Sequence, residues 1–361
     1  MMKLTFPHMG YINIPLKTFF ENLGFEVILP PKISKRTLDL GVKYAPEFAC
    51  LPLKINLGNF IEALEEGAKL IIMGGGCGPC RFGYYAEVQQ EILRELGYDF
   101  DIYVIEPGLF RNYRKVKDSF GNIPYGKIIS SARIAWKKAI IMDEIYKLLL
   151  ENRAKEKENS IINNIYSSFL DEIDKSMSVK GIVDIRDKYI KKINAAVGEY
   201  KQGIEIRVGI VGEIYVVLEP FVNLEIENKL GKLGVSVERN LYISHWLKHF
   251  LHLSKEQEEI EDKAKKYLKN FVGGHGIDSI GNTVRYAARG FDGVIQLAPF
   301  TCMPEIISES ILPRVSKEEG IPVLSLVFDE HSGDAGLQTR IEAFVDLLIR
   351  RKQNRKGVLY A

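Results

Sequence analysis

Four cysteines carry the chemistry that this sequence suggests: Cys50, Cys77, Cys80 and Cys302. Cys77 and Cys80 form a C-x-x-C pair within the glycine-rich stretch 74–80, and the other two stand alone. Four cysteines in 361 residues are too few for a disulfide scaffold, and in a cytosolic protein such a pair indicates metal or redox chemistry. The spacing favours an iron–sulfur cluster, but it leaves open a zinc site, a redox dithiol and thiols without chemistry.

The cysteines are expected at the carboxyl ends of strands. Apolar strands are predicted at 70–73 and 293–297, followed by helices at 84–96 and 303–312, and the cysteines at 77, 80 and 302 fall between them. Open α/β sheets bind ligands at this edge, and a helix N-terminus stabilises a thiolate. We therefore expect all four thiols, Cys50 included, to converge in space from two lobes.

The rest of the chain supplies the elements that must position these residues. Short apolar strands alternate with helices in the first and last thirds, which predicts parallel sheets covered on both faces. The middle is charged and helix-forming, and Ile141, Ile145, Leu148 and Leu149 follow one helical face. It is predicted to be a packing or dimerisation element. The expected domains are an α/β lobe at 1–130, a helical segment at 131–205 and a second α/β lobe at 206–361.

Several polar groups are predicted at the same sheet edges. Glu213, His275 and Glu330 are the candidate proton donors, because a reduction or dehydration at a cluster needs protons delivered. The segment 273–281, GGHGIDSIG, is interpreted as a glycine-rich loop and matches no phosphate-binding motif. Further polar residues expected at these edges are Lys54, Asn56, Glu305 and Asp329. Another group, His245, His249 and His252, is interpreted as the surface face of a helix.

Composition excludes other classes of function. Forty-nine Lys and Arg residues against 47 Asp and Glu give a formal charge of +2, which argues against a nucleic-acid partner. No apolar run approaches the ~18–20 residues of a membrane span. The N-terminal MMKLTFPHMGYINIPLK lacks the apolar core of a signal peptide. We expect a cytoplasmic protein without membrane contact.

Long blocks around these residues resemble the 2-hydroxyacyl-CoA dehydratase superfamily, in its activase-related branch. They read ACLPLKINLGNFIEALEEGAKLIIMGGGCGPCRFGYYAEVQQEIL, GGHGIDSIG, LAPFTCMPEIISESILPRVS and VLSLVFDEHSGDAGLQTRIEAFVDLL. The resemblance implies two flavodoxin-like (Rossmann-like) lobes and an oxygen-sensitive iron–sulfur cluster, with Cys50, Cys77, Cys80 and Cys302 as candidate ligands. It also implies a separate ATP-dependent iron–sulfur activator that donates low-potential electrons for a reduction or radical dehydration.

The sequence narrows this expectation. A double-cubane cluster requires about six cysteines, so a single [4Fe–4S] cluster is favoured, with zinc as the runner-up. No nucleotide-binding motif is recognised, so a partner must supply the energy of ATP. The resemblance favours a homodimer, or a heterodimer with a related subunit, acting on an acyl-CoA or another small molecule. Two functions stay open: an enzyme whose cluster has an open iron, with Cys80 as the dispensable cysteine, and a non-catalytic electron-transfer or scaffold protein with a closed four-cysteine cluster.

Overall fold

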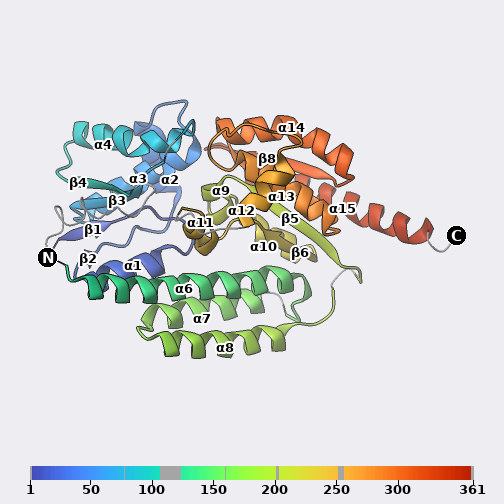
Figure 1. Ribbon diagram of the computed structural model, residues 1–361, viewed down its shortest axis with the longest axis horizontal. Helices are drawn as coiled ribbons and strands as arrows, with labels where there is room; N and C mark the ends of the chain where they lie inside the picture. Colours follow the sequence, from blue (N-terminus) through green and yellow to red (C-terminus); the bar gives the residue numbers. More distant parts are fainter. Residues whose placement is uncertain are drawn as a thin grey trace. The chain divides into compact units, whose positions relative to one another are not determined.

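The computed structural model describes residues 2–76, 78–105, 123–158, 160–200, 203–250 and 256–358 (Figure 1). Contacts within the chain divide it into two compact units. The first comprises Met1–Met142, Glu172–Asp184 and Ile243–Ser254, and the second comprises Asp143–Asp171, Ile185–Tyr242 and Lys255–Ala361. The domain boundaries at 130 and 205 stay a prediction. Among the helices described, none combines the length and apolar composition that a membrane span requires.

The first unit is built on a four-stranded parallel sheet in the order β2-β1-β3-β4. Alternate residues of β3 point to opposite faces, as the period of a strand requires. Ile71 and Met73 pack with α3 and α4, whereas Leu70 and Ile72 pack with Phe20 of α1. The elements are β1 (Lys3–Thr5), α1 (Asn13–Leu23), β2 (Glu26–Val27), α2 (Lys35–Tyr44), α3 (Leu51–Glu65), β3 (Leu70–Gly74), η1 (Arg81–Tyr84), α4 (Tyr85–Glu95), β4 (Asp101–Ile105) and α11 (Ile243–Phe250).

The second unit repeats this topology with the order β6-β5-β7-β8, again fully parallel. Gly209 of β5 faces Tyr286 of α13, and Gly293 of β7 faces Phe344 and Leu348 of α15, so helices cover both faces. The elements are β5 (Ile206–Gly212), α9 (Ile214–Leu218), α10 (Ile226–Lys232), β6 (Val235–Arg239), α12 (Glu256–Ala264), α13 (Gly276–Ala288), β7 (Gly293–Pro299), α14 (Met303–Glu319), β8 (Val323–Phe328) and α15 (Asp334–Val358).

Both sheets share the strand order of flavodoxin-like folds over their four strands. This confirms the predicted fold class, two flavodoxin-like α/β lobes with parallel sheets joined by a helical segment. The segment contains α6 (Tyr125–Asn152), η2 (Arg153–Lys155), α7 (Ile161–Lys175) and α8 (Val179–Ala196). The predicted apolar stripe is largely buried, since Ile141, Ile145 and Leu149 are fully enclosed. The stripe therefore serves packing within the chain and does not by itself indicate a dimer surface.

Buried polar contacts also anchor these helices. In the first unit Lys138 of α6 is fully buried and donates to the Thr18 hydroxyl of α1 and to the Asp174 carbonyl, both at 2.8 Å. Burial lowers its pKa to about 8. In the second unit Arg239 forms a buried ion pair with Glu227 at 3.1 Å, and the Tyr146 hydroxyl donates to the same carboxylate. These contacts specify how the helices pack, because each buried polar group needs a partner.

Two helices begin at residues where the sequence pattern does not predict a helix start. One of them, α3, begins at Leu51: every residue from Leu51 to Leu64 is buried, the polar Lys54, Asn56, Asn59 and Glu62 included, so no amphipathic period marks its start. Pro52 is compatible with this start, since a first-turn proline lacks only an amide that would have no partner anyway. The segment 273–281 is also not a continuous loop, because α13 begins within it at Gly276. Its later glycines belong to a helix.

The packing of α2 against α3 sets the position of the residue before α3, which is Cys50. A Cβ at Gly41 would lie 1.8 Å from the Lys54 carbonyl oxygen, and one at Gly58 would lie 1.9 Å from the Thr37 carbonyl oxygen. The two helices therefore touch backbone to backbone, which only glycine permits at these positions. The Ser34 hydroxyl caps the start of α2 and so helps to hold this pair in register.

We expect Gly58→Ala to lower the free energy of unfolding by about 3 kcal/mol or more, because backbone atoms cannot yield locally to the added methyl group. Urea denaturation followed by circular dichroism measures the loss. Gly126→Ala in α6 is the matched control, since no atom lies within 4 Å of its Cβ position. It should change stability by less than about 1 kcal/mol. Equal stability of the two variants would contradict the close contact.

Candidate functional site

Every cysteine that the structure describes is the residue directly before a helix. Cys50 is the N-cap of α3, Cys80 that of η1 and Cys302 that of α14. In all three the side chain makes no capping hydrogen bond, so the sulfur is not used to cap its own helix. Cys50 and Cys302 are buried, and Cys80 is more exposed. Cys77 lies outside the described residues.

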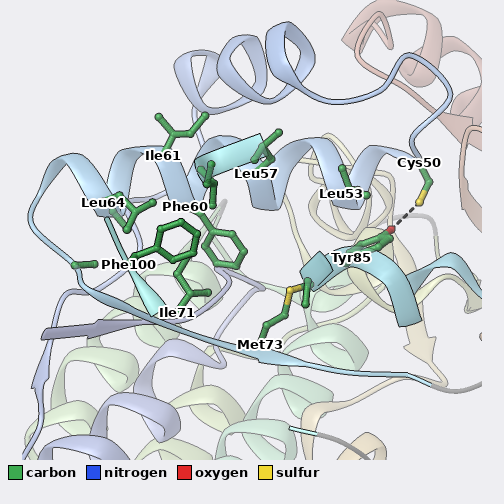
Figure 2. Close-up of a cluster of buried hydrophobic side chains, with 14 residues drawn as sticks. Cys50, Leu53, Leu57, Phe60, Ile61, Leu64, Ile71, Met73, Tyr85 and Phe100 are labelled. Atoms are coloured by element: carbon green, nitrogen blue, oxygen red, sulfur yellow. Dashed lines mark hydrogen bonds between the residues drawn. The ribbon is translucent and has the colours of Figure 1, made fainter. Parts of the chain in front are cut away.

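In the first unit two contacts join the segment around Cys80 to the segment around Cys50, and Figure 2 shows the one between Tyr85 and Cys50. The Arg81 guanidinium donates to the Phe48 carbonyl at 2.6 Å, and the Tyr85 hydroxyl lies 2.6 Å from the Cys50 sulfur. Arg81 follows Cys80 directly, and Phe48 stands two residues before Cys50. The two loops are thus held together by side chains that the sequence pattern alone did not connect.

The glycines before the C-x-x-C pair have a packing role. A Cβ at Gly74 would lie 3.3 Å from the Phe82 ring, and one at Gly76 would lie 3.0 Å from the same ring. Phe82 in turn packs edge-on against Tyr85, with ring centroids 5.3 Å apart. The bare backbone at 74 and 76 therefore accommodates the aromatic ring that supports Tyr85.

In the second unit Cys302 follows β7 through a tight turn. The Phe300 amide donates to the Phe328 carbonyl at 2.7 Å, and the Cys302 amide donates to the Pro299 carbonyl at 3.0 Å. Between them Thr301 has a φ of 65°, a value that is unfavourable for a β-branched residue. The turn keeps this conformation because backbone hydrogen bonds on both sides impose it. The position of Cys302 at the sheet edge is therefore well defined.

The segment that carries His275 abuts this turn. His275 is the N-cap of α13, and the next residue, Gly276, has room for no Cβ, because that atom would lie 2.5 Å from the Pro304 carbonyl oxygen. Pro304 stands two residues after Cys302. The structure thus places the backbone at His275 next to the first turn of α14, the helix that follows Cys302.

Glu213 lies at the same edge, directly after β5. Its amide donates to the Leu297 carbonyl of β7 at 3.0 Å, and its carboxylate accepts from the Val216 amide at 3.0 Å, which caps α9. Burial of the carboxyl raises its pKa to about 7, and the hydrogen bonds from the Val216 and Tyr215 amides only partly offset this. A carboxyl with this pKa both holds and releases a proton near neutral pH.

Glu305 is the most enclosed carboxyl of this edge, with no exposed surface. It stands in the first turn of α14 and accepts hydrogen bonds from Ser279 of α13 at 2.9 Å, Gln296 of β7 at 2.8 Å and Ser308 at 3.1 Å. Burial nevertheless raises its pKa to about 7, and the charge of Glu213 acts in the same direction. The two carboxyls therefore interact electrostatically beside the β5–β7 switch point, where such sheets bind ligands.

The other predicted site residues are placed differently. Glu330 lies on the turn after β8, one strand further out, and the neighbouring Asp329 accepts hydrogen bonds from the His331 amide and Ser332 hydroxyl within that turn. Lys54 and Asn56 are buried within α3. His245 lies in α11, whereas the side chain of His249 and all of His252 are outside the described residues. Among the described residues no group of three His, Cys, Asp or Glu side chains forms a metal site.

Sequence reasoning missed Tyr85, and it placed Glu305 without its surroundings. Tyr85 is the contact of Cys50, but it stands in a run of two tyrosines that shows no sign of which one is buried. Glu305 was expected at the edge, yet its enclosure by three polar partners depends on α13, which begins inside a segment interpreted as a loop. In the sequence, the only sign of this enclosure is the position of Ser279 within the segment GGHGIDSIG.

The raised pKa of Glu305 predicts a pH-dependent stability. Its folded pKa of about 7 exceeds the ordinary value of 4.5, so the folded protein binds more protons between these values. Stability should therefore fall as pH rises from about 4.5 to 7, by up to about 1.4 kcal/mol per pH unit. Urea unfolding of the metal-free protein at several pH values measures this slope. Glu305→Gln should reduce the slope and leave the part that Glu213, whose pKa is also about 7, contributes. Glu309→Gln on the same helix is the control that should retain the full slope.

Two known protein families match parts of this chain. The family described as CoA enzyme activase uncharacterised domain (DUF2229) matches residues 9–73, which end in β3 of the first unit. The family described as 2-hydroxyglutaryl-CoA dehydratase, D-component, matches residues 114–348, more than half of the chain, with Glu213, His275 and Cys302 inside the match. No curated protein matches the chain. On the strength of this second match, the chain belongs to the 2-hydroxyglutaryl-CoA dehydratase D-component family.

Proposed function

We propose that this chain is the iron–sulfur component of a 2-hydroxyacyl-CoA dehydratase-type system and performs a reduction or radical dehydration. The observation that carries the proposal is the placement of its described cysteines at helix N-termini, in a chain of the D-component family. The proposed ligands are Cys50, Cys77 and Cys80 of the first unit together with Cys302 of the second. The proposed cofactor is a single [4Fe–4S] cluster.

The donor chemistry of these residues fits such a cofactor. Iron–sulfur clusters are held by cysteine thiolates, and the amides at the start of a helix stabilise a thiolate. In none of the described cysteines does the sulfur make a capping hydrogen bond to its own helix. Zinc sites of four cysteines use two closely spaced pairs, whereas this chain has one pair and two single cysteines. When bound, the cluster would accept one electron at low potential.

Side chains of this protein would donate the protons that the reaction needs. Glu213 and Glu305, each with a pKa of about 7, provide carboxyls that are protonated in a large fraction of molecules at neutral pH. Glu305 is fully enclosed and so shielded from bulk water, whereas Glu213 is partly exposed and can exchange its proton more readily. His275, beside the first turn of α14, is the proposed third proton carrier, and Glu330 is the most peripheral candidate.

Partners follow from the same proposal. Energy from ATP would come from a separate iron–sulfur activator, and the matched activase-type family at 9–73 supports such an association. We further propose that the chain acts as a homodimer or with a related subunit on an acyl-CoA or another small molecule. Light scattering of the purified chain tests this assembly, and a monomer without a co-purifying relative would contradict it.

The decisive experiment is anaerobic purification of the chain with quantitation of iron, acid-labile sulfide and zinc. We expect about four iron and four sulfide per chain, with an electron paramagnetic resonance signal after reduction. Stoichiometric zinc without sulfide would overturn the proposal. Substrate turnover with an activator then separates an enzyme from a protein that only transfers electrons.

Single substitutions of the cysteines test the ligand set. Cys50→Ser, Cys77→Ser and Cys302→Ser should each lose most of the bound iron. Cys80→Ser should retain it, because Cys80 is the more exposed thiol and shares a loop with Cys77. Iron counted per chain, with circular dichroism to confirm folding, is the measurement. If Cys80→Ser loses as much iron as Cys50→Ser, the cluster is closed by four cysteines and the electron-transfer function is favoured.

A further inference from the structure

The sulfur of Cys50 has a buried hydrogen-bonding partner, the hydroxyl of Tyr85. The two atoms lie 2.6 Å apart, and both residues are almost completely enclosed, Cys50 being 8% and Tyr85 4% exposed. Figure 2 shows the hydroxyl pointing at the sulfur from the first residue of α4. Water has little access to this contact, and among the described residues the phenol is a hydrogen-bonding partner of the sulfur.

The direction of this hydrogen bond depends on the state of Cys50. In the free protein either atom can donate, because a thiol and a phenol each carry a proton. A thiolate that binds iron has no proton left, so the phenol must then donate to the sulfur. Hydrogen bonds to cluster sulfurs help to set the reduction potential of iron–sulfur proteins. A donor withdraws electron density from the sulfur and thereby favours the reduced cluster.

The surroundings of Tyr85 hold it in this position. Its ring packs edge-on against Phe82, and Phe82 rests on the bare backbone at Gly74 and Gly76. The Arg81 contact with the Phe48 carbonyl ties together the same two stretches of chain. Tyr85 therefore belongs to the segment that carries Cys80 and reaches across to Cys50.

We propose that Tyr85 is a positioning residue for the cluster: its hydroxyl donates to the Cys50 sulfur, orients this ligand and raises the potential at which the cluster accepts its electron. This inference rests on the proposed iron–sulfur function. It assigns a role to a residue that is not a ligand and has no place among the proton carriers.

The test compares Tyr85→Phe with Tyr84→Phe in the full chain, both purified anaerobically and with iron and sulfide counted first. Tyr85→Phe removes only the hydroxyl and keeps the ring against Phe82. Tyr84→Phe is the matched control, because Tyr84 is the preceding residue in the chain and is itself 70% exposed. The readouts are the cluster midpoint potential in a redox titration and the iron–cysteine stretching bands in resonance Raman spectra. The wild-type protein is also measured in D₂O, which requires no variant.

We expect Tyr85→Phe to shift the midpoint potential to more negative values and to change the stretching bands, whereas Tyr84→Phe matches the wild type. The wild-type bands should move in D₂O, and this movement should be reduced in Tyr85→Phe. An assembled cluster with the same potential and bands in all three proteins overturns the role of Tyr85 and leaves the proposed function intact. A wild-type protein without iron and sulfide overturns the proposed function and this inference with it.

Discussion

The carboxyl edge of a parallel sheet brings helix N-termini together, and the site residues of this protein depend on that constraint. In a βαβ arrangement each strand delivers the chain to the edge at which the next helix begins. Cys302 and Glu213 come directly after β7 and β5 in this way, and His275 stands at the start of α13. The free amides of helix first turns lie at the same edge. Residues distant in sequence thus share one chemical environment within the second unit.

Burial dominates hydrogen bonding at the carboxyls of this edge. Glu305 accepts three hydrogen bonds from side chains, each of which favours its charged form, yet its pKa still rises. The cost of removing a charge from water exceeds what neutral donors return, and the nearby Glu213 adds a like charge. This arrangement lowers the stability of the folded protein as the pH rises from about 4.5 to 7. Such perturbed groups concentrate at functional sites, which is consistent with the role proposed for them.

Direct backbone contact keeps the elements around the cysteines in place. The α2–α3 contact at Gly41 and Gly58 supports the helix that follows Cys50, and the contact of Gly276 with Pro304 supports the one that follows Cys302. Glycine allows carbonyl groups to approach where a side chain would force the helices apart. Close-packed interiors transmit such constraints over several residues, because few voids exist into which a neighbour can relax. A rigid frame of this kind suits a site whose ligands must meet a fixed geometry.

The sequence by itself determined the alternation of strands and helices, the parallel sheets and the cysteines before helix N-termini, because hydrophobic period and turn residues are local signals. It did not reveal that α3 begins at Leu51 or α13 at Gly276, since a helix buried on all sides has no amphipathic pattern and glycine usually opposes helices. Only the tertiary structure decided that Tyr85 and not Tyr84 meets Cys50, and that Glu305 is enclosed by Ser279 and Gln296. Burial and pairing of this kind arise from contacts between segments far apart in the chain, and no local pattern encodes them.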